Sequence, residues 1–125
     1  MTDTLLYEPP ADVRLDDLEA TLTRAFHRIN AALQRGRAVV VALDERDVEG
    51  VGEPAAAALT HGLLGLARAL AVEGGKEGRR IAVLSAPAEL DPAERAGWVE
   101  QLAASPAASG TLVRLGGGHL GRVPT

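Results

Sequence analysis

The sequence predicts an α/β fold in three layers, with a parallel sheet of about four strands between helices. Two continuously apolar runs, residues 37–43 and 80–85, have the composition of strands that are buried on both faces. Segments with helical periodicity alternate with these runs, and such alternation favours a parallel sheet with right-handed crossovers. We expect residues 1–125 to form one domain, since this length suffices for a single core.

The N-terminal third predicts a strand followed by a helix. Residues 4–8 form a short possible strand that Pro9 and Pro10 stop. A helix is expected over residues 15–35, because apolar side chains recur there at helical spacing and Gly36 can end it. The apolar positions of this helix are Leu18, Leu22, Ala25, Ile29, Ala32 and Leu33.

The centre of the chain predicts a buried strand, an acidic loop and a long helix. The strand is residues 37–43, and residues 44–53 (DERDVEGVGE) are expected to be a solvated loop. Pro54 suits the first turn of a helix over 54–74 that is apolar on nearly every side. Because that helix contains Thr60, His61 and Arg68, a buried helix fits it better than a membrane span.

The C-terminal third predicts a strand, a helix and a last strand. Residues 80–85 are the second buried strand, and Asp91 with Pro92 opens a helix that runs to about Ala104. Trp98 on that helix belongs either to the core or to an interface. The last strand is expected over residues 110–115.

The composition excludes several classes of function. A net charge of −4 with one Phe, one Tyr and one Trp gives no basis for binding nucleic acid. Without cysteine the chain has no disulfide, thiolate metal site or cysteine nucleophile. The first ten residues lack a basic region followed by an apolar run, so we expect no signal peptide and a cytoplasmic location.

From Gly36 onwards the sequence resembles the C-terminal half of a short-chain dehydrogenase/reductase. The segment GLLGLARALAVEGGKEGRRIAV is similar to the helix that follows the family's Tyr-x-x-x-Lys motif and to the next strand. GRAVVVAL resembles the strand that ends in the catalytic serine, and SGTLVRLGGG resembles the closing Thr-Gly-x-x-Leu-x-Val-Asp-Gly-Gly. The resemblance covers residues 15–118, is weaker in the first helix, and implies a partial Rossmann-like fold.

The departures from the family concern its chemistry. In this alignment Leu43 stands at the catalytic Ser, Ala56 at the Tyr and Thr60 at the Lys, while Asp17 falls at or near the helix Asn. No Gly-x-x-x-Gly-x-Gly loop links a first strand to a helix, so nothing cradles a pyrophosphate. We therefore expect a truncated, degenerate member that is not an enzyme and binds no cofactor.

The resemblance also implies a partner. In the family, the helices that correspond to 15–35 and 54–74 build a four-helix bundle between subunits. We expect this chain to be a structural or regulatory subunit that associates with itself or with an active, full-length family member, without nucleic acid or a membrane. The residues expected at the interface are Leu22, Phe26, Leu59, Gly62, Leu66 and Leu70.

The alternative hypothesis is a repurposed small-molecule site or enzyme in the old active-site region. Asp17, Asp44 and His61 are its candidate residues, although a histidine at a packing surface and a solvated acidic loop are the simpler interpretations. The acidic spacing matches no EF-hand, so no metal is expected. His119 is a candidate contact for a partner.

Overall fold

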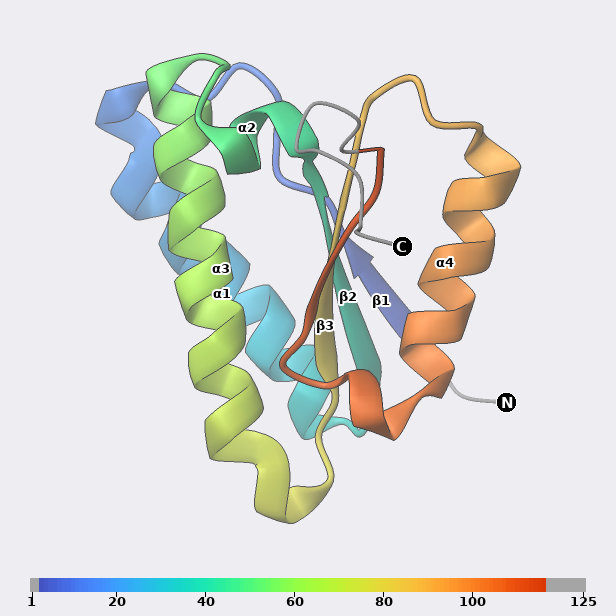
Figure 1. Ribbon diagram of the computed structural model, residues 1–125. Coiled ribbons are helices and arrows are strands. Elements are labelled where there is room, and N and C mark those ends of the chain that lie inside the picture. The colour runs from blue at the N-terminus through green and yellow to red at the C-terminus, as the bar shows by residue number, and fades with distance from the viewer. Residues whose placement is uncertain (1–2, 117–125) are drawn as a thin grey trace.

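The computed structural model describes residues 3–116, which contain four strands and four α-helices. Single 3₁₀ turns at Leu15–Asp17, Gly75–Glu77 and Pro106–Ala108 adjoin the helices. All strands are parallel and lie in chain order across the sheet, which confirms the predicted α/β class (Figure 1). The elements are β1 (Thr4–Tyr7), α1 (Leu18–Gln34), β2 (Ala38–Asp44), α2 (Glu45–Glu49), α3 (Pro54–Gly74), β3 (Ile81–Ala86), α4 (Pro92–Ala104) and β4 (Leu112–Arg114).

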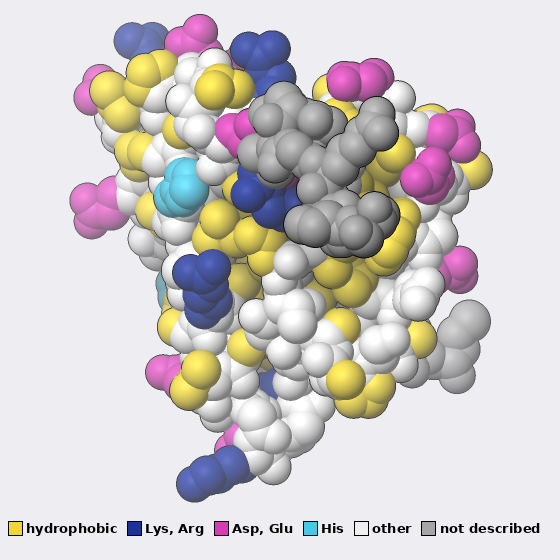
Figure 2. All heavy atoms as spheres, viewed as in Figure 1, with side chains coloured by type: hydrophobic (Ala, Val, Ile, Leu, Met, Phe, Trp, Pro, Cys, Tyr) yellow, Lys and Arg dark blue, Asp and Glu magenta, His cyan; other side chains and the backbone are white. Residues whose placement is uncertain are grey.

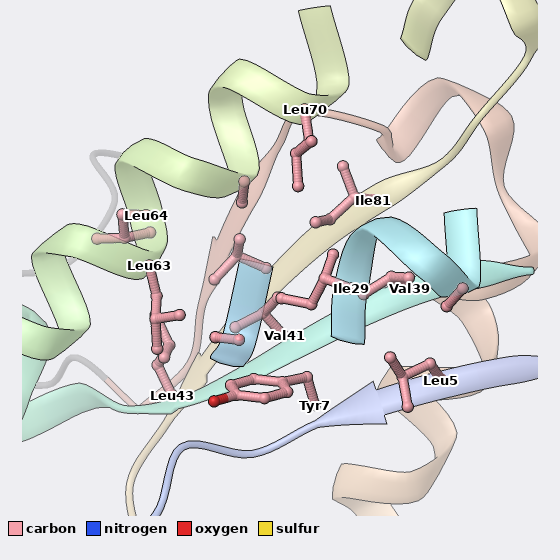
Figure 3. Packing of buried hydrophobic residues seen from close by; sticks show 14 of the residues in the cluster. Leu5, Tyr7, Ile29, Val39, Val41, Leu43, Leu63, Leu64, Leu70 and Ile81 are labelled. Atoms are coloured by element: carbon pink, nitrogen blue, oxygen red, sulfur yellow. The ribbon is translucent and has the colours of Figure 1, made fainter. Parts of the chain in front are cut away.

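The sheet separates two apolar cores, because alternate strand residues point to opposite faces. Helices α1 and α3 cover one face, where Val39, Val41 and Val83 pack against Ile29 and Leu63 (Figure 3). Helix α4 covers the other face. The buried residues of that second core are Ala38, Val40, Ala82, Leu84, Leu102 and Ala103, with Trp98 packed against them. Trp98 therefore belongs to the core, one of the two alternatives for it.

The three crossovers do not share one hand. Strand order equals chain order, so every crossover steps across the sheet in the same direction. Since α1 and α3 lie on one face and α4 on the other, the last crossover must have the opposite hand to the first two. Figure 1 shows that β1–α1–β2 and β2–α3–β3 are right-handed and that β3–α4–β4 is left-handed. The prediction of right-handed crossovers is wrong for this unit. Because β2 already pairs with one edge of β3, β4 pairs with the other edge, while α4 covers the face of the sheet that α1 and α3 leave bare.

The acidic segment after β2 differs from the predicted loop, because its first part is the short helix α2. Asp44 caps this helix by accepting a hydrogen bond from the backbone N–H of Arg46, with 2.9 Å between N and Oδ1. Gly50 ends it with φ of 78°, a conformation that glycine adopts without strain. The predicted last strand is also shorter than expected, at Leu112–Arg114.

Helix α3 packs on the sheet beside α1. Together with the turn after it, the stretch from Pro54 to Glu77 is long and apolar enough to cross a bilayer, by length and composition only. In this structure α3 packs on the sheet as a core helix does. Its buried residues are Ala55, Leu59, Thr60, Leu63, Leu64, Ala67, Leu70 and Gly74.

Candidate functional site

A cavity among the described residues lies at the carboxyl edge of the sheet, where open α/β sheets place their ligands. Its volume is about 370 Å³. The loop after β1 forms one wall, the ends of β2 and β3 form the floor, and residues of α2, α3 and α4 complete it. The lining residues are Glu8, Pro9, Pro10, Ala11, Asp12, Val13, Ala42, Leu43, Asp44, Asp47, Ala56, Ala86, Pro87, Ala88 and Arg95.

Two of the three positions aligned with the catalytic residues meet in this cavity. Leu43, at the end of β2, and Ala56, in the first turn of α3, both line it. Thr60 does not, because its side chain faces the core and only 2% of it is exposed. The cavity therefore presents a leucine and a methyl group where the resemblance places a serine and a tyrosine.

The polar wall of the cavity is mostly acidic. Glu8, Asp12, Asp44 and Asp47 line it together with one cation, Arg95. Burial raises the pKa of Asp47, the nearby charge of Asp44 raises it further, and Arg46 opposes both effects. In Figure 2 most of the visible acidic side chains lie in the upper half of the view.

The three candidates of the alternative hypothesis are not brought together. Asp44 lines the cavity, but Asp17 and His61 are exposed and do not. His61 Nε2 lies 3.0 Å from the carbonyl oxygen of Val48, so this ring nitrogen donates a hydrogen bond that ties α3 to α2. His61 therefore has a packing contact, as its simpler interpretation held. His119 lies outside the described residues.

An ion pair between the buried Glu45 and the more exposed Arg114 at the same edge was not predicted from the sequence. Glu45, only 3% exposed, accepts hydrogen bonds from the hydroxyl of Ser85 at 2.5 Å and from Nε of Arg114 at 3.1 and 3.2 Å. The Nη2 atom of Arg114 donates to the second carboxylate oxygen of Glu45. These contacts raise the pKa of Arg114, chiefly through the hydrogen bond to Glu45.

The position of these residues along the strands was the signal that could have revealed the pair. Ser85 lies between Leu43 of β2 and Arg114 of β4 in the sheet register, and Glu45 follows β2 directly. Polar residues at the carboxyl ends of neighbouring parallel strands converge on one edge. Because residues 44–53 were expected to form a solvated loop, Glu45 was not predicted to be buried.

The predicted interface residues fall into two groups. Leu59 and Leu70 are buried in the chain's own core, with 2% and 6% exposed, so the structure does not leave them free for a partner. They were predicted to contact a partner, whereas both belong to the core that α1 and α3 form on the sheet.

The other predicted interface residues lie between α1 and α3 or outside them. A Cβ at Gly62 would lie 3.0 Å from both δ carbons of Leu22, so these two residues form a close helix contact within the chain. Leu66 is partly buried against the core. Phe26 is 37% exposed and contacts the ring of His27 edge-on, with 5.5 Å between ring centroids.

Comparison with known proteins supports the fold. No family model matches the sequence, and no curated protein matches it. The crystal structure of a short chain dehydrogenase from Bacillus anthracis is similar, with a TM-score of 0.67 and 21% sequence identity. The match covers 98% of this chain and 66% of that chain. This chain therefore has the fold of a short-chain dehydrogenase over about two thirds of that protein's length.

Proposed function

We propose that this chain is a non-catalytic protein of the short-chain dehydrogenase/reductase type that serves as a structural or regulatory subunit. The observation that carries the proposal is the presence of Leu43 and Ala56 in the cavity at the carboxyl edge. Neither side chain has a proton to donate or a lone pair to accept one, so neither can replace the serine and tyrosine of a reductase. A cytoplasmic location is part of this proposal.

The partner is a second copy or a full-length reductase, and the proposed contact is the outer surface of α1 and α3. Ala58, Gly65 and Ala69 are exposed on α3, and Val72 is 82% exposed. Small side chains allow another helix to approach closely, and Val72 and Phe26 supply apolar area that an interface would bury. We name this surface, formed by Phe26, Ala58, Gly65, Ala69 and Val72, the helix-pair surface.

Native mass measurement of the chain, alone and co-expressed with a full-length reductase, tests the proposal. Ala69→Glu places a charge on the helix-pair surface without touching the core, so it should abolish the assembly while circular dichroism stays unchanged. Ala96→Glu is the matched control, because Ala96 is equally exposed but lies on α4. A chain that remains monomeric with every candidate, or an assembly that both variants disrupt equally, would contradict the proposal.

The second candidate function is a small-molecule site in the cavity of about 370 Å³, which Asp44 and Asp47 favour because both of these acidic residues line it. A thermal-shift screen against dinucleotides, acyl-CoA thioesters and divalent metals tests it. A saturable shift that Asp47→Asn removes would support this function. A saturable shift with a dinucleotide would also overturn the absence of a cofactor in the first proposal.

A further inference from the structure

A second cavity, of about 310 Å³, lies under α1 beside the edge strand β1. It shares only Glu8 and Pro10 with the cavity at the carboxyl edge. It belongs to no position that the family resemblance assigns. Its lining residues are Tyr7, Glu8, Pro10, Thr21, Arg24, Ala25 and Arg28.

Two arginines of α1 converge on this cavity. Arg24 and Arg28 are four residues apart and therefore lie on the same face of the helix. Nη2 of Arg24 donates a hydrogen bond to Oγ1 of the buried Thr21 at 3.3 Å, which fixes one guanidinium. Cζ of Arg28 lies 5.9 Å from the centre of the Tyr7 ring, in the position of a cation–π contact.

Neither guanidinium has a carboxylate partner among residues 3–116 within ion-pair distance. Each is instead held by a neutral group, Thr21 or Tyr7, and both face the same hollow. An arginine presents five N–H donors in a rigid fork that matches the oxygens of a carboxylate or a phosphate. The two guanidinium groups beside this cavity therefore have N–H donors that no carboxylate of residues 3–116 pairs with.

Tyr7 adds a hydroxyl to the same place. Its side chain is 5% exposed, and in Figure 3 the ring lies against the core with its oxygen toward the carboxyl end of β1. Burial raises the pKa of Tyr7, whereas the charges of Arg28 and Arg24 act to lower it. At neutral pH the phenol remains protonated and is a donor.

We propose that the cavity under α1 binds an oxyanion, a carboxylate or a phosphate group, between Arg24 and Arg28 with the Tyr7 hydroxyl as a further donor. Glu8 at the rim is the one acidic lining residue. It favours a ligand that carries a hydroxyl or an amine beside its oxyanion. The site is formed by a single chain, so it does not depend on the proposed assembly.

An NMR titration of the arginine Nε–Hε signals of the full chain tests the site, with inorganic phosphate and succinate as separate probes at constant ionic strength. The signals of Arg24 and Arg28 should shift saturably with at least one probe. Which probe binds more tightly distinguishes a phosphate from a carboxylate ligand.

Four variants make the test specific. Arg24→Gln and Arg28→Gln should each weaken binding about ten-fold, because each removes charge-assisted hydrogen bonds. Tyr7→Phe keeps the ring under Arg28 and should weaken binding about three-fold. Glu8→Gln removes a repelling carboxylate and should strengthen binding about two-fold.

Arg35→Gln is the matched control, because it removes the same charge from the exposed end of α1, outside the cavity. It should change the affinity less than two-fold, since an exposed charge at that distance is screened. The proposal is overturned if neither probe gives a saturable shift. It is also overturned if Arg35→Gln weakens binding as much as Arg24→Gln does, since that result would show general charge attraction.

Discussion

Glu45 is the side chain whose burial is hardest to explain without its partners. A carboxylate taken out of water is costly unless hydrogen bonds and an opposite charge compensate for it. Ser85 and Arg114 supply both, and they come from two other strands. The contact therefore fixes the ends of β2, β3 and β4 relative to one another.

Arg114→Met should destabilise the protein by about 2 kcal/mol, because it leaves the Glu45 carboxylate buried without its cation. The expected loss is below that of a fully buried pair, since the Arg114 side chain is 36% exposed. Urea unfolding at pH 7 measures it. The double variant Glu45→Gln/Arg114→Met should lose less than the two single variants lose together, and a loss equal to that sum would mean that the pair contributes no coupling energy.

Asp47 should make stability depend on pH in the acid range. Its pKa in the folded state is raised above the ordinary 3.8, so the folded state favours the protonated form. Ionised Asp47 therefore lowers stability at neutral pH, and this penalty vanishes as the pH falls below 3.8. Asp47→Asn should raise the Tm at pH 7 and leave it unchanged near pH 3.

The control for this prediction is Asp16→Asn, which removes an exposed carboxylate near the start of α1. That carboxylate lies where the helix dipole favours negative charge, so its loss should not raise the Tm. A gain from Asp47→Asn that persists at pH 3 would show that the variant acts through packing and not through charge.

Among the elements, helix α3 contains two glycines, Gly62 and Gly65, whose structural roles differ. Gly62 and Gly65 both lower helix propensity. At Gly62 the missing side chain admits Leu22 of α1, whereas an added Cβ at Gly65 would meet no atom within 4 Å. Close helix packing therefore explains Gly62, and packing within the described chain does not explain Gly65.

Gly65→Ala should stabilise the folded state by about 0.5–1 kcal/mol, because it adds helix propensity without a clash. Gly62→Ala should gain less, since the new methyl group would press on Leu22. Parallel urea unfolding of the two variants at low protein concentration measures the difference. Equal gains would mean that Leu22 moves aside freely and that the contact does not require glycine.

The two central strands were predictable from the sequence because each is a continuous apolar run. A run such as AVVVAL can only be a strand covered on both faces, and both such runs became the inner strands β2 and β3. The orientation of α3 was not predictable in the same way. A helix that is apolar on every side has no preferred face, so Leu59 and Leu70 were placed outside when they lie inside.

The candidate site was only partly predictable. Leu43 and Ala56, which the alignment placed at the catalytic Ser and Tyr, line one cavity because both positions adjoin the carboxyl edge. Thr60 lies on the same face of α3 but one turn further from that edge, where its side chain is buried in the core. The ion pair of Glu45 and Arg114 joins residues 69 positions apart, a separation over which local patterns carry no information.

For the molecule as a whole, the left-handed β3–α4–β4 crossover affects the order in which the chain folds. The right-handed twist of strands favours right-handed units, so β1–α1–β2 and β2–α3–β3 can acquire their hand as isolated segments. The last unit has the opposite hand, which the same twist disfavours. It can acquire its hand only on a sheet whose other edge is already occupied, so it should dock after the first three strands have paired.

Amide hydrogen exchange should detect β4 and α4 as a cooperative unit that is less stable than the rest of the sheet. Amides of β2 and β3 should exchange only through global unfolding, while those of β4 and α4 should exchange through a lower-energy opening that detaches both together. Arg114→Met should speed exchange in β4 more than in α1, because it removes the contact that holds this late unit to the sheet. The ion pair between Glu45 and Arg114 should then slow the detachment of β4 and α4, so that the disfavoured left-handed crossover persists once it has formed.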